Sequence, residues 1–351
     1  MSHPSIDLSN AKRRAPADIV VAQPIELETL THLEQCASTR MNAGPEPFDV
    51  EQLVTECRQA RALMAFMTER VDEALLSQCP NLKIIAGALK GFDNIDVDAC
   101  SRRGIAVTIV PDLLTEPTAE LAIALMIDVA RHIRSADQHV RAGQFAGWRP
   151  TYFGRSIMDS TIGIVGAGKV GQAIMQMLTG FRCTRLYYDT EPLAPNLESQ
   201  LGATFASLSE VQSKADFLVL ALPLTEETLG LVNDSFIANM KPESFLINPA
   251  RGSLVVESAV ADALERGQLA GYGADVFECE DWARRDRPSS IEPRLLNAQN
   301  TILTPHIGSA VTSVRRAIVS SAADSIVTLL GGAIPTTTIN PDAIKAPGSA
   351  S

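Results

Sequence analysis

A glycine-rich loop in the middle of the chain is the feature that most constrains its fold. Gly166, Gly168 and Gly171 have the spacing Gly-x-Gly-x-x-Gly and follow the apolar run 161–165. A helix-like run over 170–178 comes next, so the pattern is strand, tight turn, helix. In such a unit the glycines let the backbone approach a pyrophosphate, which the amide groups of the helix N-terminus bind. We therefore predict a dinucleotide-binding α/β domain around this loop.

An acidic residue stands where such a domain needs one. Asp189 ends the strand-like run 185–188 and lies about 20 residues beyond the glycines, as the pattern requires. A carboxylate there accepts hydrogen bonds from the adenosine ribose and repels a 2′-phosphate. The next residue is Thr190, so no cation follows directly. We predict NAD as the cofactor, with weaker use of NADP because Lys169, Arg182 and Arg185 lie nearby in the sequence.

Composition limits the class of protein. The chain has 351 residues, which is long enough for two domains. Its 41 acidic residues against 30 basic ones give a net charge of −11, which disfavours nucleic acid or an anionic membrane as a partner. The six cysteines form no Cys-x-x-Cys pair, so we expect reduced thiols and no metal site. With no signal-like start and no apolar run of membrane-spanning length, we expect a cytoplasmic enzyme.

Apolar runs alternate with helix-like stretches on both sides of the glycine loop. Before the loop we predict strands over 19–21, 62–67, 82–87 and 105–110, and helices over 26–36 and 118–142. From the loop onward we predict strands over 161–165, 185–188, 217–220, 244–248, 271–275 and 301–304, and a last helix over 313–330. This alternation indicates parallel sheets that helices cover on both faces.

The alternation predicts an α/β protein of two doubly wound parallel-sheet domains. Residues 114–312 are expected to form the NAD-binding Rossmann domain. That domain is inserted into a flavodoxin-like substrate-binding domain made of residues 1–113 and 313–351. We expect loose tails at 1–17 and 336–351. Ligands should bind at the carboxyl ends of the strands, in the cleft between the domains.

Three residues in the second half of the chain are candidates for catalysis. Arg251, Glu280 and His306 each follow a predicted strand. A histidine paired with a carboxylate can act as a general acid or base, and an arginine can hold an oxyanion with two parallel hydrogen bonds. Taken singly, the arginine and the glutamate are more often surface ion-pair residues, and the histidine could be a core residue. Their order behind the glycine loop favours a catalytic trio.

These motifs resemble those of the D-2-hydroxyacid dehydrogenase family. The similar segments are the glycine loop, Asn-x-x-Arg-Gly at 248–252, Asp-Val-Phe-Glu-x-Glu at 275–280 and Thr-Pro-His-Ile-Gly at 304–308. The resemblance spans residues 17 to 335 and implies catalytic roles for Arg251, Glu280 and His306. It also implies a homodimer joined through the cofactor domains. The cofactor contacts that we expect are Thr118, Gly166, Gly168, Lys169, Val170, Gly171, Asp189, Ala221, Leu222, Pro223, Pro249, Ala250 and Asp275.

Within this family, several segments are most similar to members that oxidise phosphite (phosphonate dehydrogenases). They are residues 64–67, 88–94, 110–115, 147–148 and 278–284. The substrate contacts that this resemblance implies are Met67, Lys90, Gly91, Trp148 and Arg315. Lys90 would add a second cation to Arg251, and two cations suit a compact dianion. Our first expectation is therefore NAD-dependent oxidation of phosphite to phosphate, with a water that His306 activates as the nucleophile.

Two other functions stay open. A D-2-hydroxyacid dehydrogenase of the hydroxypyruvate or glycerate type would use the same trio and cofactor. Lys90 and Trp282 argue against it, because hydroxyacid enzymes usually have a small residue in the Lys90 loop and a proline after the catalytic glutamate. An NAD(H)-sensing corepressor on the same fold is the third possibility, since a fold does not fix a function. The intact trio argues against that one.

Overall fold

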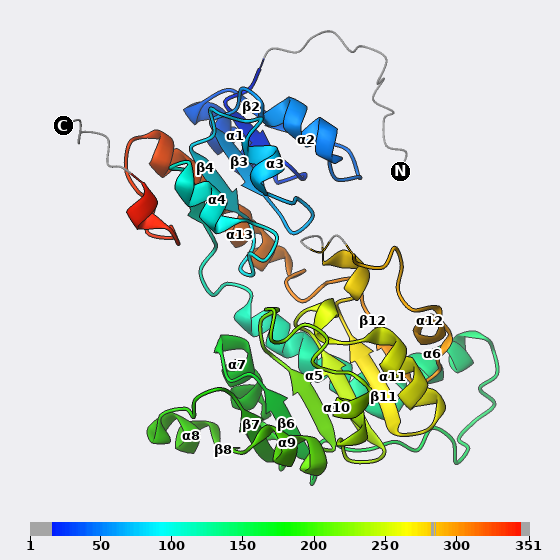
Figure 1. Cartoon of the computed structure of the whole chain (residues 1–351). Coiled ribbons are helices and arrows are strands. Elements are labelled where there is room, and N and C mark those ends of the chain that lie inside the picture. The colour runs from blue at the N-terminus through cyan, green and yellow to red at the C-terminus, as the bar shows by residue number, and fades with distance from the viewer. Residues whose placement is uncertain (1–15, 282–283, 285, 345–351) are drawn as a thin grey trace. The chain divides into compact units, whose positions relative to one another are not determined.

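The computed structural model describes residues 16–281, 284 and 286–344. Internal contacts divide the chain into two compact units. The first comprises the described residues within Met1–Pro111 and Ile318–Ser351, and the second comprises those within Asp112–Ala317. Each unit contains one sheet, and all strand pairs in both sheets are parallel. The predicted α/β class with two parallel sheets is confirmed (Figure 1).

The first unit has a five-stranded sheet in the order β2-β1-β3-β4-β5. Its strands are β1 (Ile19–Val21), β2 (Thr39–Met41), β3 (Ala62–Ala65), β4 (Ile84–Gly87) and β5 (Ala106–Thr108). Its helices are α1 (Leu27–Cys36), α2 (Val50–Cys57), α3 (Glu73–Leu76), α4 (Val97–Arg102) and the later part of α13 (Thr312–Leu330). Every residue of β1, β3, β4 and β5 is buried. Short uninterrupted apolar runs of this kind are typical of parallel strands that helices cover on both faces.

The chain beyond residue 335 is attached to this sheet. The Ile339 amide donates a hydrogen bond of 2.9 Å to the Val107 carbonyl oxygen, and the Val107 amide donates one of 2.8 Å to Asn340 Oδ1. These bonds satisfy backbone groups that β5 would otherwise expose at the edge of the sheet. The prediction of a loose tail is therefore wrong for residues 336–344. The rest of that tail and residues 1–15 lie outside the described residues.

The second unit has a seven-stranded sheet in the order β12-β11-β10-β9-β6-β7-β8. Its strands are β6 (Thr161–Val165), β7 (Thr184–Tyr188), β8 (Ala203–Phe205), β9 (Phe217–Leu220), β10 (Ser244–Asn248), β11 (Leu269–Ala274) and β12 (Thr301–Leu303). Its helices are α5 (Thr115–Arg131), α6 (Ile133–Arg141), α7 (Lys169–Met177), α8 (Pro195–Leu201), α9 (Leu208–Lys214), α10 (Asp234–Ala238), α11 (Glu257–Glu265) and α12 (Pro293–Asn297). Three-residue turns of 3-10 helix occur at Leu178–Gly180, Gly252–Leu254 and Glu278–Glu280.

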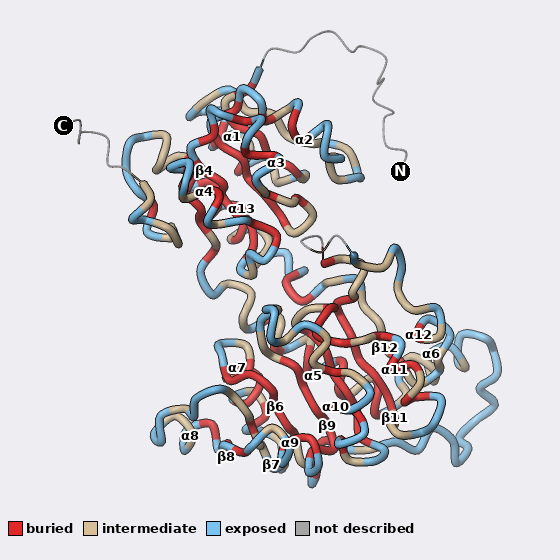
Figure 2. Tube along the Cα trace, viewed as in Figure 1, coloured by how far each residue is buried: buried red, intermediate tan, exposed pale blue. Residues whose placement is uncertain are grey.

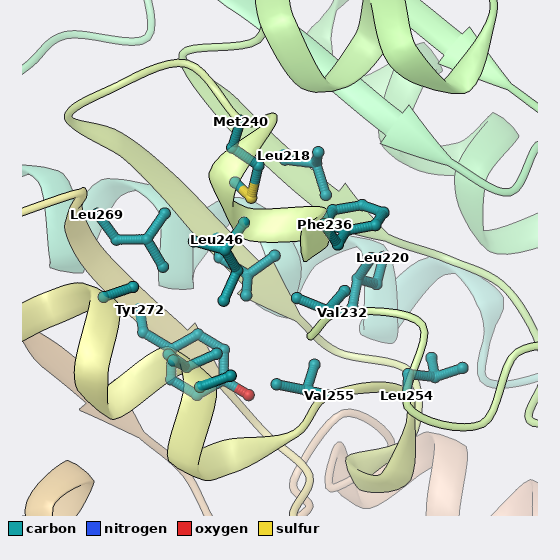
Figure 3. Close-up of a cluster of buried hydrophobic side chains, with 14 of the residues drawn as sticks. Leu218, Leu220, Val232, Phe236, Met240, Leu246, Leu254, Val255, Leu269 and Tyr272 are labelled. Atoms are coloured by element: carbon teal, nitrogen blue, oxygen red, sulfur yellow. The ribbon is translucent and has the colours of Figure 1, made fainter. Parts of the chain in front are cut away.

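The central strands of this sheet contribute side chains to two cores, one on each face. Along β9, Phe217 and Val219 join a core with α5 and α7, whereas Leu218 and Leu220 join a core with α9, α10 and α11. This alternation follows the two-residue period of a strand. Figure 2 shows the buried strands at the centre of the unit, and Figure 3 shows the second of the two cores around Tyr272. Both faces of the sheet are covered, so its strand ends are the places left for a ligand.

The structure differs from the predicted long helix over 118–142. His132 has a left-handed backbone with φ of 54°, and this residue separates α5 from α6. The Arg134 amide donates a hydrogen bond of 3.0 Å to Asp128 Oδ1, which stabilises the new helix start. The sequence analysis also missed β2 and β8, because three-residue edge strands carry little periodic signal. None of the described helices is both long and apolar enough to cross a membrane.

Candidate active site

The three glycines of the loop after β6 have different surroundings. Gly166 has φ of 102°, and a Cβ atom there would lie 2.4 Å from the Ala221 carbonyl oxygen. A Cβ atom on Gly171 would lie 2.0 Å from the Gly166 carbonyl oxygen, so both positions require glycine. Gly168 is the exposed N-cap of α7, and a Cβ atom there would meet nothing within 4 Å. Two glycines therefore pack the loop, and Gly168 leaves the helix N-terminus accessible to an anion.

Asp189 follows β7 and is bonded to this loop. Its Oδ2 atom accepts a hydrogen bond of 2.7 Å from the Ala167 amide, and its Oδ1 atom accepts one of 2.7 Å from the Thr190 amide. Arg185, a possible cation for a 2′-phosphate, instead donates to backbone, including a 3.0 Å bond from Nε to the Leu201 carbonyl oxygen. The loop and the carboxylate fit a dinucleotide without a 2′-phosphate.

The other predicted cofactor contacts of this unit lie along the same edge of the sheet. Lys169 and Val170 form the first turn of α7, which begins directly after the β6 loop. The segment 221–223 follows β9, and the segment 249–250 follows β10. Because β10, β9 and β6 are neighbouring parallel strands, their carboxyl ends meet at one edge. The structure thus brings the predicted cofactor residues of three strands together.

Arg251, Glu280 and His306 follow β10, β11 and β12, which are also neighbours. His306 Nδ1 lies 2.9 Å from Glu280 Oε2, and the two side chains are 25% and 27% exposed. The Phe277 amide donates a hydrogen bond of 2.9 Å to Glu280 Oε1. The carboxylate is therefore held through both oxygens. Since it occupies Nδ1, Nε2 is the ring nitrogen that can exchange a proton with a substrate.

The backbone of His306 is strained and is held in place by Asp275. His306 has φ of 55°, a conformation that costs about 1–3 kcal/mol in a residue with a side chain. Its amide donates a hydrogen bond of 2.8 Å to the Asp275 carbonyl oxygen. The Asp275 carboxylate, buried with 1% exposure, accepts bonds from the amides of Ile307 and Gly308 and from Thr304 Oγ1. Burial raises the pKa of Asp275, and these hydrogen bonds act in the opposite direction.

Thr118 of α5 lies beside the same loop. A Cβ atom on Gly308 would be 3.3 Å from both Thr118 Oγ1 and Asp275 Oδ2. Both residues are predicted cofactor contacts, and the structure places them together. The carboxylate oxygens of Asp275 already accept three hydrogen bonds within the chain. Asp275 therefore also fixes the geometry of the His306 loop.

The turn that carries Arg251 is closed by Asn248, the last residue of β10. Asn248 Nδ2 donates a hydrogen bond of 2.8 Å to the Arg251 carbonyl oxygen, and the Ala250 amide donates one of 3.1 Å to Asn248 Oδ1. The sequence analysis did not list Asn248 or Thr304 as site residues. The sequence could have indicated both residues, because each is polar and stands at or just after the end of an apolar strand, where the site residues of such a fold lie.

Three predicted substrate contacts belong to the first unit. Met67 follows β3, and Lys90 and Gly91 follow β4, so all three lie at the carboxyl edge of the five-stranded sheet. Lys90 is exposed and Met67 is half-buried. The loops that carry them are joined by Asn94, whose side chain donates a hydrogen bond of 2.9 Å to the Phe66 carbonyl oxygen. The first unit thus presents a lysine and a methionine at the expected end of its sheet.

The structure does not bring the remaining two predicted substrate contacts to the same place. Arg315 lies in the first turn of α13, with Nη1 3.4 Å from Ser309 Oγ, close in sequence to His306. Trp148 is 78% exposed in the loop between α6 and β6. Phe153 of that loop lines a cavity with Asn300, which directly precedes β12. This amino end of β12 is opposite the end that carries His306. Trp282 lies outside the described residues.

Helix α6 and the loop that follows it expose apolar side chains. Val140, Phe145, Trp148 and Phe153 are each 56% to 78% exposed. Exposed apolar patches of this kind are common where proteins bind one another. The homodimer that the resemblance implies stays a prediction, and these exposed side chains are compatible with it.

Comparisons with known proteins agree with this geometry. A family model described as "D-isomer specific 2-hydroxyacid dehydrogenase, NAD binding domain" matches residues 123–308. A glyoxylate reductase of Pyrococcus furiosus is 39% identical over 300 residues, which cover 84% of this chain and 87% of the relative. The solved NADPH-dependent glyoxylate/hydroxypyruvate reductase of Sinorhizobium meliloti, in complex with NADP and malonate, has a TM-score of 0.80 and 28% identity, and the match covers 93% of this chain and 98% of that one. The D-lactate dehydrogenase of Aquifex aeolicus, complexed with NAD and lactic acid, has a TM-score of 0.79 and 25% identity, over 92% and 98% of the two chains.

The glycine loop yields a matched pair of variants. Gly171→Ala should destabilise the protein by about 1–3 kcal/mol, because its methyl group would overlap the Gly166 carbonyl oxygen. Gly168→Ala should change stability by less than about 0.5 kcal/mol and weaken NADH binding about tenfold, because its methyl group would lie where a pyrophosphate approaches the backbone. Thermal unfolding without cofactor and titration of NADH by fluorescence measure the two effects. Unchanged NADH affinity in Gly168→Ala would contradict the assignment of the loop.

Proposed function

Because this chain belongs to the D-isomer specific 2-hydroxyacid dehydrogenase family, we propose that it reduces small 2-oxo acids of the glyoxylate and hydroxypyruvate type with a nicotinamide cofactor. The observation that carries this proposal is the 2.9 Å hydrogen bond between His306 and Glu280, beside Arg251 at one edge of the NAD-binding domain. The name of the Pyrococcus furiosus relative supports a 2-oxo acid as the substrate. The reverse reaction is the oxidation of a D-2-hydroxyacid.

The mechanism follows from the roles that the three side chains can take. The bound reduced nicotinamide supplies the hydride that the carbonyl carbon of the substrate accepts. His306, as an imidazolium, donates the proton on Nε2 to the carbonyl oxygen, which becomes the hydroxyl group of the product. Glu280 stabilises that imidazolium through the bond to Nδ1. Arg251 binds the substrate carboxylate through its planar guanidinium and stabilises charge on the carbonyl oxygen.

Oxidation of phosphite is the second candidate. The observation that favours it is Lys90, an exposed cation at the carboxyl end of β4, where hydroxyacid enzymes usually have a small residue. In that reaction a water would supply the new oxygen on phosphorus, His306 would accept a proton from that water, and the hydride that leaves phosphorus would be transferred to the oxidised nicotinamide. The relative reported above is named for glyoxylate, which is why we place this reaction second.

The cofactor domain binds NAD in this family, and the reported structures include complexes with NAD and with NADP. We propose that this chain prefers NADH to NADPH. The support is the carboxylate of Asp189, which is held against the glycine loop at the end of β7. A 2′-phosphate at that point would meet a negative charge.

Comparison of substrates tests the proposed reaction. With purified protein, glyoxylate or hydroxypyruvate plus NADH should give a kcat/KM at least about a hundredfold above that of phosphite plus NAD, a difference of roughly 2.8 kcal/mol in transition-state binding. The change in nicotinamide absorbance near ~340 nm follows both directions. A higher kcat/KM with phosphite would overturn the order of the two candidates. Absence of turnover with every substrate would favour a sensor protein on this fold.

Cofactor preference tests the assignment of Asp189. Asp189→Asn removes the charge and keeps an oxygen that can accept the Ala167 amide bond, so the loop should keep its shape. The ratio of kcat/KM for NADPH to that for NADH should rise about tenfold or more. Glu191→Ala, which removes a nearby exposed carboxylate, is the matched control and should leave the ratio within about twofold. If the unmodified protein already prefers NADPH, Asp189 does not set the preference.

A further inference from the structure

We propose that Asp281 is a positioning residue that fixes the Arg251 turn against the Glu280 turn. It does not belong to the trio itself. Its side chain joins the loop after β11 to the loop after β10, and it follows Glu280 directly in the sequence. The inference rests on the proposed function only in giving Arg251 the role of binding the substrate anion.

The central contact is a hydrogen bond between two buried groups. Asp281 Oδ2 accepts a bond of 2.6 Å from the Ser253 amide. Asp281 is 4% exposed and Ser253 is 1% exposed. Ser253 lies two residues after Arg251, in the Gly252–Leu254 turn of 3-10 helix. A movement of the Arg251 backbone away from the Glu280 turn would therefore break a buried, charge-assisted hydrogen bond.

Two further contacts hold the same pair of turns together. A Cβ atom on Gly252 would lie 1.9 Å from the Phe277 carbonyl carbon, so the two backbones touch and glycine is required. Arg284 Nη1 donates a hydrogen bond of 2.9 Å to Ser253 Oγ. The Ser253 amide and hydroxyl are thus both bound by groups of the loop after β11. Asp281 is the acidic member of this arrangement.

A second pair of hydrogen bonds joins the segments after β10 and β11 close to the Asp281–Ser253 bond. Glu257 Oε1 accepts a hydrogen bond of 2.9 Å from the Glu278 amide, and Glu278 Oε1 accepts one of 3.3 Å from the Glu257 amide. This reciprocal pair joins the start of α11 to the Glu278–Glu280 turn. Burial raises the pKa of Glu257 and of Glu278, and the charge of Asp281 adds to that effect. Asp281 thus lies near other carboxylates, and the hydrogen bond from the Ser253 amide stabilises its charge there.

The physical consequence concerns the orientation of Arg251. Its guanidinium must stay at a fixed distance from the His306–Glu280 pair to bind the anionic part of a substrate while the proton is transferred. Asn248 closes the Arg251 turn from the β10 side, and Asp281 fixes it from the β11 side. We therefore expect the hydrogen bond of Asp281, and not its charge alone, to set the distance between the Arg251 turn and the Glu280 turn.

Two substitutions at Asp281 separate the hydrogen bond from folding. Asp281→Ala should lower kcat/KM about tenfold or more, through both KM and kcat, and leave the Kd for NADH within about twofold. Asp281→Asn keeps an oxygen that can accept the Ser253 amide bond, so it should recover at least threefold of the loss. Thermal unfolding of both variants shows whether the protein is folded. An Asn variant as impaired as the Ala variant would overturn the proposal.

A double-mutant cycle with Arg251 tests whether the effect passes through that residue. In an Arg251→Lys background, Asp281→Ala should lower kcat/KM less than about threefold, because the geometry that Asp281 protects is already lost. An undiminished tenfold effect would overturn the proposal. Asp234→Ala is the control, since this carboxylate at the start of α10 is 74% exposed, lies outside these contacts and should change kcat/KM less than twofold. The cycle uses whichever substrate the unmodified protein turns over, so a failure of glyoxylate as the substrate is distinguishable from a failure of this inference.

Discussion

The geometry of the proposed proton donor depends on one buried carboxylate, that of Asp275. It lies just after β11 and accepts three hydrogen bonds from the segment after β12, two from backbone amides and one from Thr304. These bonds hold His306 in a left-handed conformation that its side chain disfavours. Without them the imidazole would lose its fixed distance to Glu280. The geometry of the His306 loop is therefore set by hydrogen bonds within the second unit.

The parallel sheet explains why such a cluster can form from distant parts of the sequence. Arg251, Glu280 and His306 are separated by many residues, but β10, β11 and β12 are neighbours and end at the same edge. Asn248 closes the turn after β10, Asp281 joins the loop after β11 to that turn, and Asp275 joins the loop after β11 to the loop after β12. In the proposed function the trio supplies the chemistry, and Asn248, Asp281 and Asp275 hold the turns that carry it. This division resembles other sites in which a supporting layer of hydrogen bonds orients the reacting groups.

Most of the fold could be predicted because buried parallel strands are short apolar runs bounded by polar residues. The predicted and observed bounds agree for Ile19–Val21, Thr161–Val165, Phe217–Leu220 and Ser244–Asn248. The break at His132 was not predictable, since a left-handed residue other than glycine has no distinct signal in one sequence. The attachment of residues 336–344 to β5 was missed for a related reason. It depends on backbone bonds and on Asn340 rather than on apolar periodicity.

The candidate site was predictable where a motif fixes both residue type and strand position. The structure places the glycine loop, Asp189 and the predicted trio at strand ends, as the motifs indicate. The role of Trp148 stays a prediction, because an exposed loop carries no register that says which end of the sheet it approaches. The substrate was not predictable from the sequence, because Lys90 shows that a charge lies at a strand end but does not show which molecule that charge binds. The similarity to a relative named glyoxylate reductase is the reason that we propose a 2-oxo acid before phosphite as the substrate.

The central claim is that His306, held by Glu280, transfers the proton of the reaction. Substitution of His306 by alanine, followed by separate measurement of kcat and of the Kd for NADH, tests it most directly. The account predicts that kcat falls by about a hundredfold to ten-thousandfold, the usual contribution of a general acid, while the Kd for NADH stays within about twofold. A kcat close to that of the unmodified protein would contradict it.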